Sequence, residues 1–287
     1  MKILKTPFFL AIVTTFVQFA SAQQSNTSTI DIALIGKNGK SGHYLKTRGF
    51  NMYYEIYGKG SPMLFIHPNG GSIKSFLHQI PYFSKHHKVI IADSRAQGKS
   101  VDMSDSLNYE MMADDYNALL DSLHLDSCYV VGWSDGGING LLLAIRHPEK
   151  VKKLAITGAN LIPDTSVFNP GVIAMISESM TMLRSAKQDA ATKNTMKLVH
   201  MMEVEPNIPL TDLHKIKCPV LVMGGDNDGI KPGHTLEIFE NIPQAYLWIF
   251  PAAGHATLQR YKDEFNNKVK DFFLQPYHKP KWNDWDE

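Results

Sequence analysis

Gly132, Ser134 and Gly136 form a small-x-Ser-x-small pattern, which suits a serine nucleophile on a tight turn between a strand and a helix. The preceding residues, Tyr129–Gly132, are mainly apolar, and the following residues, Gly137–His147, show the apolar spacing of a helix. The glycines remove side chains where such a turn must pack closely. The sequence therefore predicts that Ser134 is a nucleophile for acyl transfer.

A serine hydroxyl needs a base, and that base needs an acidic group to orient it. His255 follows the apolar run Tyr246–Phe250, whereas Asp226 and Asp228 follow an apolar run that ends at Gly224. Because parallel strands bring their carboxyl ends to one edge of a sheet, we expect these side chains to meet the serine there. The chain order serine, aspartate, histidine suits this architecture. Asp228 is the preferred acid because it lies further out on its loop, and Asp226 is the alternative.

A developing oxyanion needs two preorganised backbone N–H groups. Asp135 directly follows the nucleophile and supplies the first donor. The second is expected from the loop His67–Gly71, where Pro68 has no N–H and Asn69 is therefore the predicted donor. His67 is a rival for the role of base, but at the opening of this loop we expect it to brace the loop through hydrogen bonds.

Apolar runs alternate with stretches of helical spacing along most of the chain. This alternation predicts an α/β fold, with a mainly parallel sheet covered by helices on both faces. The predicted strands are Met63–His67, Val89–Asp93, Tyr129–Gly132, Lys153–Thr157, Val220–Gly224 and Tyr246–Phe250. The predicted helices between them are Ile73–Phe83, Met111–Leu123, Gly137–His147 and His234–Asn241.

One region interrupts the alternation and shows no strand pattern. Residues 161–209 contain two stretches of helical spacing, Val172–Arg184 and Asp189–Met202. Because this region lies between two predicted core strands, we expect a helical cap over the site. The whole hydrolytic domain is predicted to span residues 48–275, with a C-terminal tail at 276–287.

The N-terminus has the pattern of a secretory signal. Lys2 and Lys5 precede the apolar stretch Phe8–Phe19, and Ala20–Ala22 offers a small-x-small cleavage site. A membrane anchor is the rival interpretation, but the stretch is short and contains polar residues. We expect a signal peptide at 1–22, export to the periplasm or the exterior, and no stable membrane anchor after cleavage.

Residues 23–47 are rich in Ser, Thr, Asn and Gly and predict a flexible segment before the domain. Cys128 and Cys218 each precede an apolar strand-like run, and we expect two buried free thiols rather than a disulfide. With 287 residues and 44% hydrophobic content, the chain can bury a full core as one domain with an insertion. The oligomeric state is not indicated.

Composition and motifs exclude several functional classes. The formal net charge is +1 and no long run of like charges occurs, which argues against a nucleic-acid partner. No H-E-x-x-H or similar ligand spacing predicts a metal, and no cofactor is implied. The expected partner is a small-molecule ester substrate.

Several of these motifs resemble those of α/β-hydrolases over nearly all of the predicted mature chain. Asp93–Ser100 resembles the family's D-x-R-G-x-G-x-S stretch, with Ala96 in place of a usual glycine, and Pro68 likewise replaces a common glycine. The resemblance implies the α/β-hydrolase fold and a serine hydrolase acting on carboxylic ester bonds. It also implies that Asp93 and Arg95 support the fold rather than act in catalysis.

A narrower resemblance is to the valacyclovir hydrolase group, also called biphenyl hydrolase-like proteins. The matching stretches are G-W-S-D-G-G-I, Gly158–Asn160 and Asp263–Asn266. This resemblance implies that Asp135 binds the free α-amino group of an amino-acid ester, whereas a helix-capping role is the alternative. The alternative functions are those of a lactonase, a C–C hydrolase, a cofactor-free perhydrolase, an aminopeptidase or a non-catalytic ligand-binding protein.

Overall fold

A single sheet organises the computed structural model, which describes residues 30–279 and 281. Within these residues its eight strands lie in the order β1-β2-β4-β3-β5-β6-β7-β8. Strand β2 is antiparallel to both β1 and β4, and all other neighbours are parallel. The strands are β1 (Gly42–Thr47), β2 (Phe50–Tyr57), β3 (Ser61–Ile66), β4 (His87–Ala92), β5 (Cys128–Trp133), β6 (Val151–Thr157), β7 (Val220–Gly225) and β8 (Ala245–Phe250).

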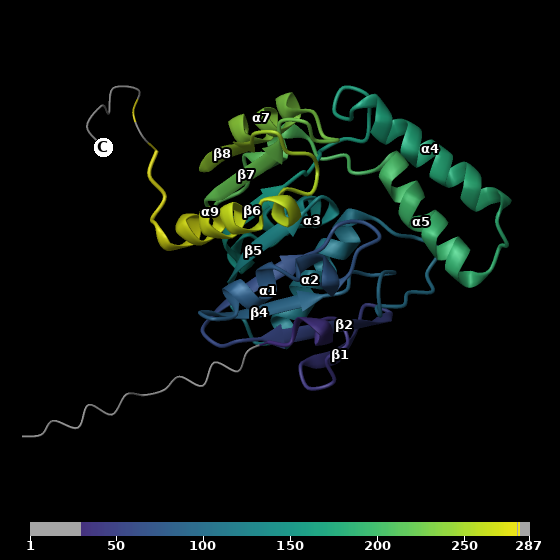
Figure 1. The fold of residues 1–287 in the computed structure, drawn as a ribbon, viewed down its shortest axis with the longest axis horizontal. Helices are drawn as coiled ribbons and strands as arrows, with labels where there is room; N and C mark the ends of the chain where they lie inside the picture. Colours follow the sequence, from purple (N-terminus) through teal and green to yellow (C-terminus); the bar gives the residue numbers. More distant parts are fainter. Residues whose placement is uncertain (1–29, 280, 282–287) are drawn as a thin grey trace, which may run out of the picture.

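Helices cover both faces of this sheet (Figure 1). They are α1 (Gln79–Phe83), α2 (Tyr109–Ser122), α3 (Asp135–Arg146), α4 (Pro170–Ser185), α5 (Ala190–Val204), α6 (Leu210–Leu213), α7 (Pro232–Glu240), α8 (Thr257–Arg260) and α9 (Lys262–Leu274). Because strand side chains alternate, Leu64 and Ile66 pack toward α2, α3 and α7, whereas Met63 and Phe65 pack toward α1 and α9. This architecture confirms the predicted fold class.

Helices α4 and α5 follow β6 in the chain and precede β7, and they project as a pair from one end of the domain (Figure 1). They pack against each other over a small apolar cluster that includes Phe168, Ile176 and Ile230. This pair lies within residues 161–209, where the helical cap was predicted. The small apolar cluster is separate from the two large clusters in the body of the domain, whereas Met201 of α5 belongs to one of the large clusters.

The edge of the sheet near the N-terminus differs from the prediction. Residues 42–47 form β1 rather than part of a flexible segment, and β2 was not predicted at all. The buried Glu55 carboxylate accepts hydrogen bonds from the Tyr53 and Tyr57 hydroxyls and from the N–H groups of Gly36 and Asn38. These bonds attach the preceding loop to the sheet. The sequence alone does not indicate these bonds, because a glutamate side chain is usually exposed to solvent.

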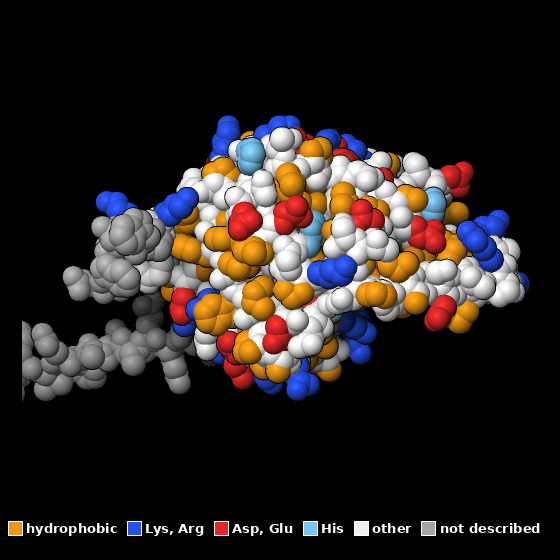
Figure 2. All heavy atoms as spheres, turned by 90° about the horizontal axis from the view of Figure 1, so that it is seen from above, with side chains coloured by type: hydrophobic (Ala, Val, Ile, Leu, Met, Phe, Trp, Pro, Cys, Tyr) orange, Lys and Arg blue, Asp and Glu red, His pale blue; other side chains and the backbone are white. Residues whose placement is uncertain are grey.

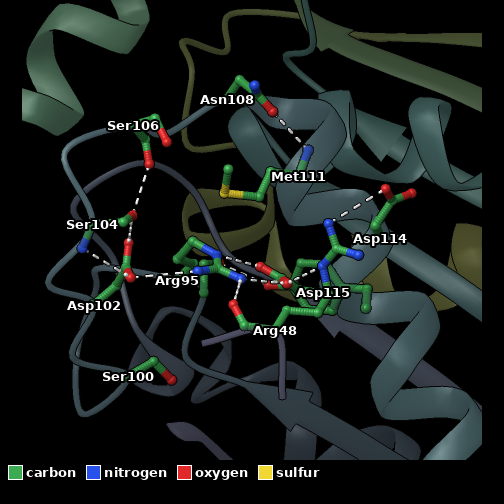
Figure 3. Close-up of polar contacts among 12 residues, drawn as sticks. Arg48, Arg95, Ser100, Asp102, Ser104, Ser106, Asn108, Met111, Asp114 and Asp115 are labelled. Atoms are coloured by element: carbon green, nitrogen blue, oxygen red, sulfur yellow. Dashed lines mark hydrogen bonds and ion pairs between the residues drawn. The ribbon is translucent and has the colours of Figure 1, made fainter. Parts of the chain in front are cut away.

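Arg95, from the motif after β4, is buried in a network of acidic side chains (Figure 3). Its Nε and Nη2 atoms donate to the two Asp115 carboxylate oxygens at 2.7 Å, and Nη1 lies 3.4 Å from Asp102. The guanidinium also stacks 4.0 Å from the Phe50 ring centroid. Lys197 of α5 reaches the same Asp102. A buried cation needs such partners, and here they connect the loop after β4 to α2 and to the cap.

The remaining predictions concern the termini, the cysteines and the surface. Residues 1–22 and most of the tail 276–287 lie outside the described residues. Cys128 and Cys218 are both buried and unpaired. Within 30–279 and 281, no helix combines the length and apolar character needed to cross a bilayer. On the face seen in Figure 2, Lys and Arg side chains are interspersed with Asp and Glu.

Candidate active site

Ser134 lies on the sharp turn that joins β5 to α3. Its backbone has φ +56° and ψ −119°, a region that non-glycine residues rarely adopt. A Cβ atom at Gly136 would lie 1.9 Å from the Ile66 carbonyl oxygen, and one at Gly132 would lie 2.2 Å from the Gly136 carbonyl oxygen. Both positions therefore require glycine, and the turn can hold the serine hydroxyl above the carboxyl edge of the sheet.

The structure brings Ser134, His255 and Asp228 together in one hydrogen-bonded row. The Ser134 Oγ lies 2.9 Å from His255 Nε2, and His255 Nδ1 lies 2.6 Å from Asp228 Oδ1. Asp228 also accepts the Ile230 N–H at 3.1 Å. Asp226 instead accepts hydrogen bonds from backbone N–H groups of the loop after β8. Of the two aspartates considered from the sequence, only Asp228 contacts the imidazole.

The partners of His255 define its protonation state. Because Asp228 presents a carboxylate oxygen, Nδ1 carries the proton, and Nε2 is left to accept from the Ser134 hydroxyl. Burial lowers the pKa of His255, but the hydrogen bond and charge of Asp228 and the charge of Asp135 outweigh it, so the net pKa is raised. The imidazole is thus arranged to take a proton from the serine.

Gly158, directly after β6, forms a wall of the histidine site. Its φ is +66°, and a Cβ atom there would lie 2.7 Å from His255 Cε1 and 2.9 Å from Nδ1. The same atom would lie 3.4 Å from Asp228 Oδ2. Gly158 belongs to the Gly158–Asn160 stretch noted in the sequence, although its contact with the imidazole was not predicted.

His67 lies in the loop after β3 and is fully committed to local hydrogen bonds. The Ser94 N–H donates to its Nε2 at 2.9 Å, so Nδ1 carries the proton and donates to the Pro68 carbonyl at 2.8 Å. Burial lowers the pKa of His67, although the Pro68 bond and the Asp93 charge oppose this effect. With both ring nitrogens engaged and the ring buried, His67 has no atom available to act as a base.

Asp135, the first residue of α3, carries a carboxylate directly after Ser134 in the chain. The residue is only 4% exposed. Asn69 Nδ2 donates to its Oδ2 at 2.9 Å, and the Tyr109 hydroxyl is a further hydrogen-bond partner. Burial raises the pKa of Asp135 to about 6, even though the bonds from Asn69 and Tyr109 favour the charged form. Sequence reasoning missed Tyr109, because the first residue of an amphipathic helix carries no signal of such a contact.

A cavity of about 550 Å³ lies between the loop after β4 and helix α5, with Ala96, Met103, Asn194 and Lys197 in its lining. Ser134 and His255 do not line it. The hydrogen-bonded row is therefore a better guide to chemistry than the size of a cavity. In the part of the chain that the structure describes, no three His, Cys, Asp or Glu side chains are grouped to hold a metal ion.

Comparison with known proteins places these features among hydrolases. Residues 61–177 match the family model described as alpha/beta hydrolase fold. Serine hydrolase BPHL from Homo sapiens is 26% identical over 242 residues, which cover 78% of this chain and 83% of the relative. The 2-hydroxy-6-oxo-6-phenylhexa-2,4-dienoate hydrolase of Burkholderia cepacia is 24% identical over 286 residues, covering 86% and 97%.

Among solved structures, Est816, described as an N-acyl homoserine lactone degrading enzyme, matches with a TM-score of 0.68 and 25% identity. The match covers 80% of this chain and 100% of Est816.

Proposed function

Because residues 61–177 match the alpha/beta hydrolase fold and the chain is similar to known hydrolases, we propose that it is a serine hydrolase that cleaves small carboxylic esters. The observation that supports this proposal is the row Ser134–His255–Asp228 at a strained turn, with hydrogen-bond distances of 2.9 and 2.6 Å. A strained turn is retained only where the surrounding structure holds it. A nucleophile, a base and an orienting acid are what acyl transfer requires.

In the proposed mechanism, Ser134 Oγ attacks the ester carbonyl carbon while His255 Nε2 takes the hydroxyl proton. The C–O bond to the leaving group then breaks, and the imidazolium returns the proton to the departing alkoxide. Water next attacks the acyl-enzyme, losing a proton to the same nitrogen, and the carboxylic acid leaves as Ser134 regains its hydrogen. Throughout, Asp228 holds Nδ1–H and stabilises the charged imidazolium.

We assign the oxyanion hole to the backbone N–H groups of Asp135 and Asn69. Helix α3 begins at Asp135, so this N–H is among the first four of the helix, which have no acceptor within it. The positive end of the helix dipole lies at the same point and favours a developing negative charge. Asn69 supplies the second donor from the loop after β3, which the His67 ring braces.

We further propose that the Asp135 carboxylate binds an ammonium group, so that α-amino-acid esters are preferred substrates. With its pKa raised to about 6, this carboxylate is charged at neutral pH. It accepts hydrogen bonds from Asn69 and Tyr109, which leaves part of the capacity of about four lone-pair sites for a cationic donor. The resemblance of the G-W-S-D-G-G-I stretch to the valacyclovir hydrolase group implies the same preference.

Lactones are the second candidate substrate class, favoured by the structural likeness to Est816. The same serine attack would open the ring, and the new hydroxyl group would stay attached to the acyl group both in the acyl-enzyme and in the hydroxy acid that hydrolysis releases. A lactone has no ammonium group, so it gives the Asp135 carboxylate no charged partner. The two classes therefore make opposite demands on that residue.

We also propose that the protein is exported, with residues 1–22 removed as a signal peptide and no stable membrane anchor remaining. The motif that supports this lies outside the described residues. N-terminal sequencing of the protein secreted or released from the periplasm tests it. A first residue near Gln23 supports cleavage, whereas a retained Met1 contradicts it.

The decisive experiment is labelling of the protein with a serine-directed fluorophosphonate. We expect stoichiometric labelling of the wild type and none of Ser134→Ala, with both proteins equally folded by circular dichroism. A panel of plain esters, lactones and aminoacyl esters with free or acetylated amines then identifies the substrate class. Labelling or turnover that survives in Ser134→Ala contradicts the proposed function.

A further inference from the structure

The side chain of Asn69 lies where three separate segments of the fold meet. From the loop after β3, its Nδ2 donates to Asp135 Oδ2 of α3 at 2.9 Å. The same nitrogen donates to the Leu198 carbonyl oxygen of cap helix α5 at 3.3 Å. An amide nitrogen has two hydrogens, so both are used by these two bonds.

Each of the two bonds joins Asn69 to a different part of the site. The first reaches the residue directly after the nucleophile, and its acceptor is a buried, charged carboxylate, which makes it a strong bond. The second reaches the backbone of α5, which packs against α4 and has no part in the sheet. The Asn69 side chain therefore touches the nucleophile turn and the cap at the same time.

We propose that Asn69 is a positioning residue whose side chain couples the docking of cap helix α5 to the geometry of the nucleophile turn and its oxyanion donors. This inference rests on the proposed function, because the backbone N–H groups of Asn69 and Asp135 are the donors assigned there. When α5 is docked, both hydrogens of the amide are held. When α5 moves away, Leu198 is lost as a partner and the loop after β3 is held only from one side.

Such coupling has a consequence for selectivity. A substrate that holds α5 against the domain stabilises the arrangement in which both oxyanion donors are in place. The energy of binding under the cap then appears in kcat rather than only in KM, as in induced fit. Small substrates that leave α5 undocked are expected to react slowly even where their reacting groups are equivalent.

The chain offers a matched control in Asn194 of α5. Its Nδ2 donates to the Ala96 carbonyl oxygen at 2.6 Å, so it also links the cap to the body of the domain through an asparagine side chain. Within the described part of the chain, no hydrogen bond joins Asn194 to Asp135. Removing either asparagine side chain weakens cap docking, but only removal of Asn69 also takes away the hydrogen bond to Asp135.

The experiment compares Asn69→Ala with Asn194→Ala by amide hydrogen exchange and by steady-state kinetics on one ester. We expect faster exchange in α5 in both variants, and at residues 134–138 a larger acceleration in Asn69→Ala than in Asn194→Ala. In Asn69→Ala, kcat should fall roughly 10- to 100-fold with little change in KM, the loss expected for one hydrogen bond to a charged group. Asn194→Ala weakens docking of α5 but keeps the bond from Asn69 to Asp135, so its kcat should fall by less than that of Asn69→Ala.

Asn69→Ser serves as a second variant if Asn69→Ala does not fold. A hydroxyl has one donor hydrogen, so it can retain only one of the two bonds, and we expect an intermediate kcat. The inference is overturned if removing the Asn69 side chain leaves exchange at 134–138 unchanged, or if both asparagine variants lose kcat equally. The exchange measurement needs no turnover, so it decides the coupling even if fluorophosphonate labelling disproves the proposed function.

Discussion

Gly158→Ala is the substitution that tests the geometry of the histidine site most directly. The added methyl group would lie 2.7 Å from His255 Cε1 and 2.9 Å from Nδ1. Carbon atoms in contact normally lie about 3.5 to 4.0 Å apart, so the imidazole must move by roughly 1 Å. The glycine also has φ +66°, which an alanine adopts only with strain.

These two effects have different magnitudes and different readouts. The left-handed backbone costs an alanine about 1 to 2 kcal/mol of folding free energy. A displacement of about 1 Å in a catalytic group can cost roughly 100-fold in rate. His255 has bonds of 2.6 Å to Asp228 and 2.9 Å to Ser134, so one movement disturbs both contacts. We therefore expect a modest loss of stability and a large loss of kcat.

Gly49→Ala separates strain from collision. Gly49 has φ +89°, in the same left-handed region, but a Cβ atom there meets nothing within 4 Å. It lies in the turn between β1 and β2, away from Ser134, His255 and Asp228. Urea unfolding and ester hydrolysis should show similar stability losses in both variants and a loss of kcat only in Gly158→Ala.

The pH profile gives a further readout for Gly158→Ala. Asp228 raises the pKa of His255, so an imidazole displaced from Asp228 should titrate at lower pH. The acid limb of the kcat/KM profile should therefore shift to lower pH. The reasoning is refuted if Gly158→Ala keeps the wild-type kcat and pH profile while losing as much stability as Gly49→Ala.

Four further predictions concern His255, the activity and the stability of a variant of Asp135, and the buried Arg95. Because the pKa of His255 is raised, kcat/KM should fall as pH drops through a value above the ordinary 6.5. His255→Ala should lower kcat by about 1,000-fold or more, and a larger loss of kcat in a folded His67→Ala would reverse the assignment of the base. Asp135→Asn should lower kcat/KM for aminoacyl esters by roughly 30-fold to several thousand-fold but keep the activity on their N-acetylated forms. Equal losses of kcat/KM on both substrates would contradict binding of an ammonium group by Asp135. Burial raises the pKa of the Asp135 carboxyl from 3.8 to about 6, so the native wild type binds a proton that the unfolded chain releases, and it loses stability as pH rises between these values. In urea unfolding, Asp135→Asn should therefore be more stable than the wild type by about 2 to 3 kcal/mol above pH 6, and this difference should vanish below pH 4. Arg95→Met should lower the free energy of unfolding by about 3 kcal/mol, because it leaves the buried Asp102 and Asp115 without this cation, and a loss near zero in the same assay would contradict the supporting role.

Much of the fold follows from local pattern in the sequence. Fully buried parallel strands appear as continuous apolar runs, and the runs from Met63 onward were found on that basis. Strand β2 was missed because its residues are mixed in polarity and include Glu55, whose burial depends on tyrosines and backbone groups brought together only in the folded chain. The predicted helix Ile73–Phe83 is in fact a short 3₁₀ turn, Ile73–Phe76, followed by α1.

The sequence by itself determined which residues were candidates for chemistry, because a turn motif and the chain order of serine, aspartate and histidine are one-dimensional features. Only the tertiary structure decided which groups meet. Asp226 and Asp228 are two residues apart, yet the path of one loop directs only Asp228 to His255. The contacts of Asp135 with Asn69 and Tyr109 join three distant segments, and packing of helices on the sheet, which no local pattern encodes, sets those distances.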